Sequence, residues 1–135
     1  MCQHQNRVFL LTRIADHMYR MAIFGLIVAA EDPSLDSNRI IAMALVHDIA
    51  EAVTGDLTPL CRVSDEEKQK REQNAMQLFV QLLSGSNAAK HIEDLWHEYE
   101  CRSSPEARLV KDLDRFELCI QALEYEYGAS VTDSP

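Results

Sequence analysis

The sequence predicts an all-α protein, and three observations lead to this prediction. Apolar residues recur at three- and four-residue spacing through most of the chain, which is the helical period. The 135 residues include only four glycines and four prolines. Neither strand alternation nor an Asn-Gly hairpin turn is present. We therefore expect one domain, a bundle of about five main helices around a single core.

Composition limits the functions that this chain can have. Thirteen basic and 22 acidic residues give a formal net charge of −9, which opposes binding to a nucleic-acid polymer through its phosphates. The longest apolar run near the N-terminus, residues 8–11, is too short for a signal peptide or a membrane span. The four cysteines lie far apart without a C-x-x-C pair, so no zinc ribbon or disulfide framework is indicated. A soluble cytoplasmic protein that does not bind membranes is the expectation.

The first helix is predicted over residues 13–30, because apolar residues there form one stripe. Residues 1–12 show no period long enough to assign, so their structure stays open. His17 lies on the apolar stripe, and the segment 31–34, Glu-Asp-Pro-Ser, ends the pattern. The residues predicted to face inward are Met21, Phe24 and Val28.

The second predicted helix begins at a cap formed by Asp36 or Ser37 and ends near Thr54-Gly55. Asp and Ser side chains accept hydrogen bonds from the free N–H groups of a first helical turn, whereas glycine favours the end of a helix. Residues 55–63 follow as a loop with a proline inside it.

The third predicted helix begins at a capping box, in which Ser64 is the N-cap and Glu67 lies three residues further on. Its charged opening segment is expected to face solvent, and Ser-Gly-Ser at residues 84–86 ends it. The residues predicted to be buried are Ala75, Leu78, Phe79 and Leu82.

The last two helices are predicted on either side of Ser103-Ser104-Pro105. The fourth covers about residues 88–100, and the fifth begins with Ser104 as its cap and a proline at its first position. The fifth helix runs to about Tyr127, where a polar tail follows. Inward residues are predicted to be Ala88, Ile92, Leu95, Trp96 and Tyr99 in the fourth helix, and Val110, Leu113, Leu118 and Ile120 in the fifth.

Three ionisable residues interrupt the apolar face of the second helix: His47, Asp48 and Glu51. On a continuous helix they share an arc of about 100°. Upstream, the same arc carries Ile40, Ile41 and Ala44. The arc therefore faces the core, where unpaired charge is strongly unfavourable. A cation held by His47 and Asp48, with Glu51 one turn along, compensates such charges.

Four ionisable residues from three helices stand where the pattern predicts an apolar residue: His17, His47, Asp48 and Asp114. Asp112, by contrast, points about 160° away from Asp114 and is expected in solvent. Each of the four alone is more often a buried hydrogen-bonded group than a ligand. As a set from three helices, they indicate a metal site.

Two imidazoles and two carboxylates suit Mn, Co, Fe, Zn or Mg and leave coordination positions for water. The absence of a thiolate opposes a closed structural zinc site. A metal ion acidifies its bound water and neutralises a phosphoryl oxygen, so hydrolysis of a phosphate ester is the expected chemistry. Glu51 can orient or deprotonate that water. Asp56 can reach the leaving oxygen, the substrate sugar or a second cation.

The cationic residues near these positions in the sequence are expected at the surface, although one or two of them can hold phosphate. They are Arg13, Arg20, Lys111 and Arg115.

Four ordered blocks resemble the HD-domain metal-dependent phosphohydrolases, a family named after a His-Asp pair like His47-Asp48. The blocks are residues 16–22 (DHMYRMA), 44–51 (ALVHDIAE) with Gly55-Asp56, 95–100 (LWHEYE) and 111–114 (KDLD). They resemble the eukaryotic HD domain-containing protein 2 branch, which in turn is similar to the bacterial 5′-deoxynucleotidases. The expected HD domain is 13–127, between the segment 1–12 and a polar tail, 128–135.

This resemblance implies the same four metal ligands as the burial pattern, with Glu51 as the catalytic carboxylate and Asp56 as a second acidic site residue. In two-metal relatives these two help to hold the second ion. The implied reaction is the hydrolysis of deoxyribonucleoside 5′-monophosphates to deoxynucleoside and phosphate. The implied enzyme is a homodimer that uses Mn, Co or a similar divalent ion.

The sequence also departs from the family pattern. Members usually have a longer segment before the first ligand helix, with an Arg-Trp pair that contacts substrate, and a further helical segment after the last ligand. Here no Trp precedes His17, and no substrate-binding residue is assigned. The chain is thus expected to be a shortened member. One alternative is a protein that binds metal or nucleotide, or dimerises, without turnover; another is a helical interaction domain without metal.

Overall fold

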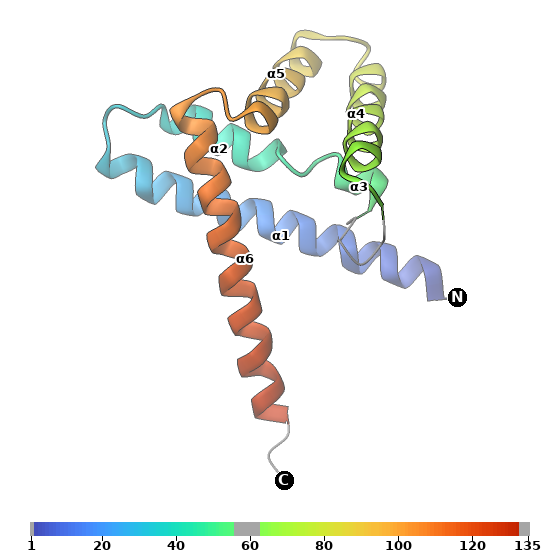
Figure 1. The fold of residues 1–135 in the computed structure, drawn as a ribbon, viewed down its shortest axis with the longest axis vertical. Helices are drawn as coiled ribbons and strands as arrows, with labels where there is room; N and C mark the ends of the chain where they lie inside the picture. Colours follow the sequence, from blue (N-terminus) through green and yellow to red (C-terminus); the bar gives the residue numbers. More distant parts are fainter. Residues whose placement is uncertain (1, 56–62, 133–135) are drawn as a thin grey trace.

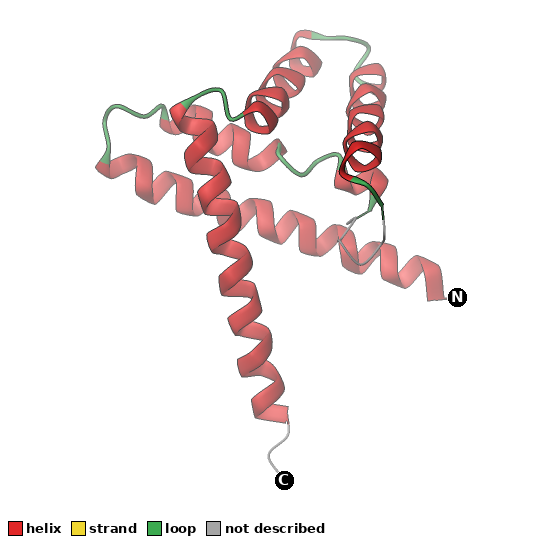
Figure 2. Ribbon diagram, in the orientation of Figure 1, coloured by secondary structure: helices red, strands yellow, loops and turns green. Residues whose placement is uncertain are grey.

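Helices make up all the regular structure of the residues that the computed structural model describes, which are 2–55 and 63–132, with side chains for 13–55 and 63–127 (Figures 1 and 2). The all-α prediction is confirmed. The helices are α1 (Cys2–Glu31), α2 (Ser37–Val46), α3 (Glu51–Thr54), α4 (Asp65–Leu82), α5 (Asn87–Cys101) and α6 (Pro105–Thr132). None of the described helices is both long and apolar enough to cross a membrane.

The helix α2 is the centre of the fold, since it packs against α1, α5 and α6. Figure 1 shows α6 passing over α1 and its second half projecting beyond the other helices. The core between these helices contains fully buried side chains from each of them: Met21, Ile40, Met43, Leu95 and Val110. Ligand candidates on α1, α2 and α6 are therefore held together by one apolar core.

Gly25 lets α1 and α2 approach each other closely. A Cβ atom added at Gly25 would lie only 2.6 Å from the Cγ2 methyl of Ile40. Because Ile40 is branched at Cβ and fully buried, that methyl cannot move aside without repacking. The glycine thus costs some helix propensity but sets the spacing of the two helices that carry the histidines.

The predicted N-caps are confirmed. A side-chain oxygen accepts a hydrogen bond from the backbone N–H three residues on at Asp36 (3.1 Å), Ser64 (3.2 Å) and Ser104 (3.0 Å). Ser86 caps α5 in the same way. Local side-chain chemistry thus fixes where four of these helices begin.

The second predicted helix is wrong in its length. It ends at Val46, and a turn over residues 47–50 leads into the short α3. In this turn the hydrogen bonds of Ile49 and Glu51 run to the third residue back rather than the fourth, which tightens the chain. The arc derived for a continuous helix therefore does not hold beyond His47, whose own N–H still bonds to Met43 O at 2.9 Å.

The other helices differ from the prediction mainly at their ends and on their faces. The helix α1 begins at Cys2, and α6 continues past Gly128 to Thr132. Several residues predicted to be buried are exposed: Val28, Leu78, Leu82, Ala88 and Leu118. Small residues occupy the inner face instead, among them Ala22, Ala29, Ala89 and Ala107. The large apolar residues were misleading because helices that pack closely need small side chains at the contact.

Candidate metal centre

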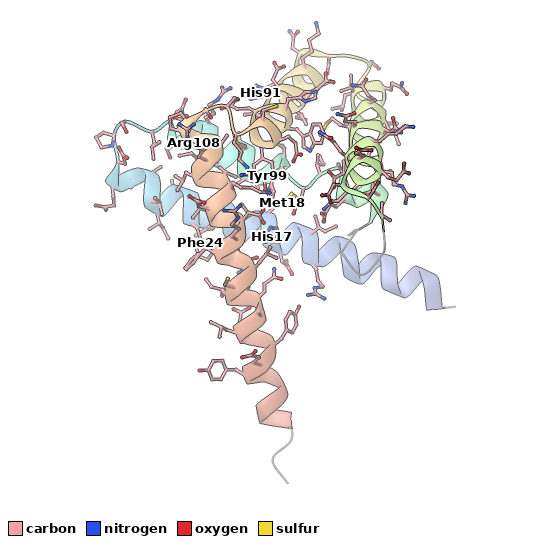
Figure 3. All side chains as sticks on the ribbon, in the orientation of Figure 1. His17, Met18, Phe24, His91, Tyr99 and Arg108 are labelled. Carbon is pink, nitrogen blue, oxygen red and sulfur yellow. The ribbon has the colours of Figure 1, made fainter. Side chains whose placement is uncertain are left out.

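The four residues predicted as metal ligands come together where α1, α2 and α6 meet. His17 Nε2 lies 3.2 Å from Asp114 Oδ1 and 3.6 Å from Asp48 Oδ2, and His47 Nε2 lies 3.3 Å from Asp48 Oδ2. One donor atom each of His17, His47 and Asp48 lies within 4.8 Å of the others, a group that could hold a metal ion. In Figure 3, His17 lies near the crossing of α1 and α6.

His47 presents a buried nitrogen without a hydrogen-bond partner. Its Nδ1 lies 2.9 Å from the carbonyl oxygen of Ala44, which only accepts, so Nδ1 carries the proton. In the neutral ring, Nε2 then bears a lone pair, and this atom is buried and unpartnered in a residue that is 2% exposed. A lone pair aimed at the carboxylate of Asp48 is unfavourable unless a cation lies between them. The donor set therefore fits a divalent metal ion.

Without a metal ion, the carboxylates of the site favour a proton on His17. Burial alone would lower its pKa, but hydrogen bonds to Asp114 and Glu117 and the charge of Asp48 raise it to about 9. The surrounding carboxylates thus draw one positive charge onto the imidazole. A divalent ion at the same place satisfies those carboxylates in place of that proton.

Tyr99 and Lys111 hold Asp114 ionised and oriented. The sequence predicted only a core position for Tyr99 and a surface position for Lys111. Tyr99 donates its hydroxyl to Asp114 Oδ2 at 2.7 Å, and Lys111 Nζ lies 3.3 Å from the same oxygen. Burial would raise the pKa of Asp114, but the hydrogen bonds from His17 and Tyr99 hold it well below its usual range. Oδ1 is left to face His17. Asp112 is exposed, as predicted.

Glu117 is a member of this cluster that the sequence analysis missed. It is 0% exposed, and its Oε2 contacts Nδ1 of His17. The prediction chose Leu118 as the inward residue, yet Leu118 is 51% exposed. The available signal was spacing, since Glu117 follows Asp114 by three residues and so lies on the same helix face.

A polar cavity of about 290 Å³ opens beside the donor set, near the lower limit for small-molecule sites. Glu51, at the start of α3, lines it. Asp56 lies outside the described residues. The cavity is lined by His47, Asp48, Ala50, Glu51, Asp65, Lys68, Gln69, Glu72, Trp96, Tyr99, Glu100 and Lys111.

Sequence comparison finds relatives over most of the chain. The chain is 44% identical over 113 residues to "5'-deoxynucleotidase HDDC2" of Homo sapiens and 48% identical over 113 residues to the protein of that name from Danio rerio. It is 47% identical over 116 residues to "5'-deoxynucleotidase hdd1" of Schizosaccharomyces pombe. Each match covers 84% of this chain but only 54%, 55% and 58% of the respective relative. The chain thus spans about half the length of these curated relatives.

Comparison with solved structures finds proteins of similar fold. The fold is similar to that of "HD domain-containing protein YGK1(YGL101W)", with a TM-score of 0.68 and 35% identity over 91% of this chain and 66% of that one. A "predicted metal-dependent phosphohydrolase" from Magnetospirillum magnetotacticum aligns with a TM-score of 0.60 and 30% identity, over 76% of this chain and 51% of that one.

The HD domain family model matches residues 4–133, a range that includes all four predicted ligands. The resemblance inferred from the four sequence blocks is thereby confirmed. Since the match extends over nearly the whole sequence and the His47-Asp48 pair lies in the donor set, this chain belongs to the HD domain family.

Proposed function

We propose that this chain carries the catalytic core of a metal-dependent phosphohydrolase, a 5′-deoxynucleotidase that cleaves deoxyribonucleoside 5′-monophosphates to deoxynucleoside and phosphate. The observation that carries the proposal is the buried, unpartnered His47 Nε2 opposite Asp48, beside a polar cavity. The substrate class is supported by the names of the relatives, of which this chain spans about half.

His17, His47, Asp48 and Asp114 are the proposed ligands of a divalent ion, which is Mn, Co, Mg, Fe or Zn. When bound, such an ion supplies a Lewis acid for the phosphoryl oxygen and a water molecule of lowered pKa. The protein residues contribute the rest of the chemistry. Tyr99 and Lys111 keep Asp114 ionised, and the Ala44 carbonyl accepts the hydrogen bond from Nδ1 of His47, which leaves Nε2 as the ring atom that faces the site.

Glu51 is the proposed general base. It lines the cavity next to Asp48 and is the first residue of α3, directly after the tightened turn over residues 47–50. The proton that it takes comes from the water whose oxygen attacks phosphorus, while the bond from phosphorus to the sugar oxygen breaks. Asp56 is proposed as the second acidic residue, which protonates or orients the leaving oxygen. If two ions bind, Glu51 and Asp56 are the proposed ligands of the second.

Lys68 is the residue that we propose for binding the substrate phosphate. It lines the cavity from α4, and its Nζ lies 3.6 Å from Glu72 on the same helix. Burial would lower the pKa of Lys68, but attraction by Glu72, Glu51 and Asp48 raises it, so the ammonium stays charged. Lys111, the other lysine at the cavity, already donates to Tyr99 at 2.7 Å.

A homodimer in the cytoplasm completes the proposal. Support for the location comes from Cys101 and Cys119, which are exposed free thiols of the kind that persists in a reducing compartment. Support for a dimer comes from large apolar side chains exposed along α1 and α6. They include Tyr19, Ile23 and Ile27 on α1 and Phe116, Leu123 and Tyr125 on α6.

The proposed activity is tested by phosphate release from a panel of deoxy- and ribonucleoside monophosphates with Mn²⁺, Co²⁺, Mg²⁺, Fe²⁺ or Zn²⁺. Wild type is expected to cleave deoxynucleotides, and Asp48→Ala to lower kcat/KM by roughly 100-fold or more, because a ligand of the Lewis acid is lost. Exposed Asp112→Ala is the matched control and should retain wild-type rates. Metal and nucleotide binding without any phosphate release would favour the binding module without turnover.

Metal affinity is expected to rise with pH. His17 has a pKa of about 9 without metal, so below that pH a cation must displace its proton. The apparent association constant for Mn²⁺ should increase about tenfold per pH unit between pH 6 and 8 and level off near pH 9. Titration calorimetry in buffers of different ionisation enthalpy counts the protons. An affinity independent of pH over this range would exclude displacement of that proton.

Lys68→Met is expected to raise KM for deoxynucleotides by roughly tenfold and to change kcat less, since a charge-assisted contact to the phosphate is lost. Lys70→Met, on the exposed face of the same helix, is the matched control. Initial-rate kinetics of both variants measure the difference. Equal KM values for the two variants would remove Lys68 from the substrate site.

Sedimentation equilibrium tests the dimer. The chain is expected to sediment at twice its mass of 15.4 kDa, and Ile23→Glu together with Leu123→Glu to shift it toward monomer because charge opposes burial of these faces. A wild type that stays monomeric at high micromolar concentration would contradict the proposal.

A further inference from the structure

Glu117 is a fully buried carboxylate that has no role in the chemistry proposed above. Its side chain is 0% exposed. An ionised carboxylate at such a position is retained only where charged or hydrogen-bonding partners surround it. Which partners surround Glu117, and what they hold in place, therefore indicates its role.

Both carboxylate oxygens of Glu117 have defined neighbours. Oε2 contacts Nδ1 of His17 and accepts a hydrogen bond from Gln121 Nε2 at 2.9 Å. Oε1 lies 3.0 Å from Nε of Arg20. Arg20 in turn donates through its two terminal nitrogens to Glu124, at 2.8 and 3.1 Å. The guanidinium of Arg20 thus lies against the buried carboxylate of Glu117 and links it to Glu124.

The contact with His17 determines how that ring is presented. An ionised carboxylate can only accept, so Nδ1 of His17 carries a proton. The ring is thereby held between α6 on one side and the ligand cluster on the other. Nε2 is the atom left to face Asp48 and Asp114, at 3.6 and 3.2 Å.

We propose that Glu117 is a positioning residue of the metal centre: it fixes the ring of His17 with Nδ1 protonated, so that Nε2 points at the cation held by Asp48 and Asp114. This inference rests on the metal site of the proposed function. It makes α6 the source of both a ligand, Asp114, and the residue that orients the ligand of α1. Arg20 takes part by compensating the charge of Glu117.

The two imidazoles of the site are held in different ways. The Nδ1 of His47, the C-cap of α2, donates to the neutral carbonyl of Ala44 in the last turn of that helix. The Nδ1 of His17 donates to a charged carboxylate on another helix. A carboxylate partner makes an imidazole a stronger donor to metal than a carbonyl does. Glu117 therefore strengthens the ligand that has no orienting group on its own helix.

The competing explanation is that Glu117 only joins α1 to α6. In that case its loss lowers stability as the loss of any buried ion pair does and leaves metal affinity unchanged. Glu124 provides the matched control, since it also pairs Arg20 of α1 with α6 but is largely exposed and does not contact His17. The two carboxylates share one arginine and differ in their access to the histidine.

The experiment measures binding of Mn²⁺ alone to the full chain by titration calorimetry. Glu117→Gln, which keeps the shape and an acceptor oxygen, is expected to lower affinity roughly tenfold. Glu117→Leu, which removes the acceptor, is expected to lower it toward 100-fold. Glu124→Gln should bind as wild type does. In a His17→Ala background, Glu117→Gln should cause no further loss, because the effect acts through that ring.

Four outcomes would overturn the inference. Wild-type affinity in Glu117→Gln and Glu117→Leu, with a lowered Tm in chelator, would leave only the helix-joining role. An equal loss with and without His17 would place the action of Glu117 elsewhere. Failure of wild type to bind Mn²⁺ or any of the other candidate ions would remove the metal site and, with it, this role. If the Glu117 variants do not fold, the metal-free wild type still decides: its NMR spectrum must show a hydrogen-bonded proton on Nδ1 of His17, and a spectrum without one overturns the assignment.

Discussion

The burial of charge is the constraint on which the rest of this structure depends. Two imidazoles and three carboxylates lie at the junction of three helices, where His17, His47 and Glu117 are buried and the side chains of Asp48 and Asp114 are only 25% and 13% exposed. Two buried atoms of the cluster lack a hydrogen-bond partner: Glu117 Oε1, which pairs with the cation of Arg20, and His47 Nε2, which faces the carboxylate of Asp48. A cation at this point removes the conflict and makes the cluster a ligand set.

The helices are arranged to hold these groups from distant parts of the sequence at fixed separations. Close contact of α1 with α2 at Gly25 sets the spacing of the histidines. The chain tightens into a turn directly after α2, which takes Asp48 and Glu51 out of the helix and toward the cavity. Two local features of the sequence thus set the geometry of the site: the absence of a side chain at Gly25 and the interruption of the helix after Val46.

The sequence was sufficient for the fold class, the capped helix starts and three residues whose donor atoms could hold a metal ion, His17, His47 and Asp48. These depend on local chemistry or on a polar residue placed on an apolar stripe, and both can be read directly from the amino-acid sequence. It failed where the answer depended on which neighbour a helix meets. Leu118 was predicted to face inward, whereas the buried residue is Glu117, and only the partners Arg20 and His17 make a carboxylate acceptable there. The interruption after Val46 was missed for a similar reason, since nothing in that stretch breaks helical periodicity.

The central claim is that His17, His47, Asp48 and Asp114 together bind one divalent ion. The most direct measurement is a crystal structure of the protein grown with Mn²⁺, with anomalous diffraction data to locate the metal. We expect one strong peak within roughly 2.0–2.3 Å of both Nε2 atoms and of one oxygen from each aspartate. A peak bound elsewhere, or a site where His47 Nε2 remains without a metal at full Mn²⁺ occupancy of the protein, would contradict it.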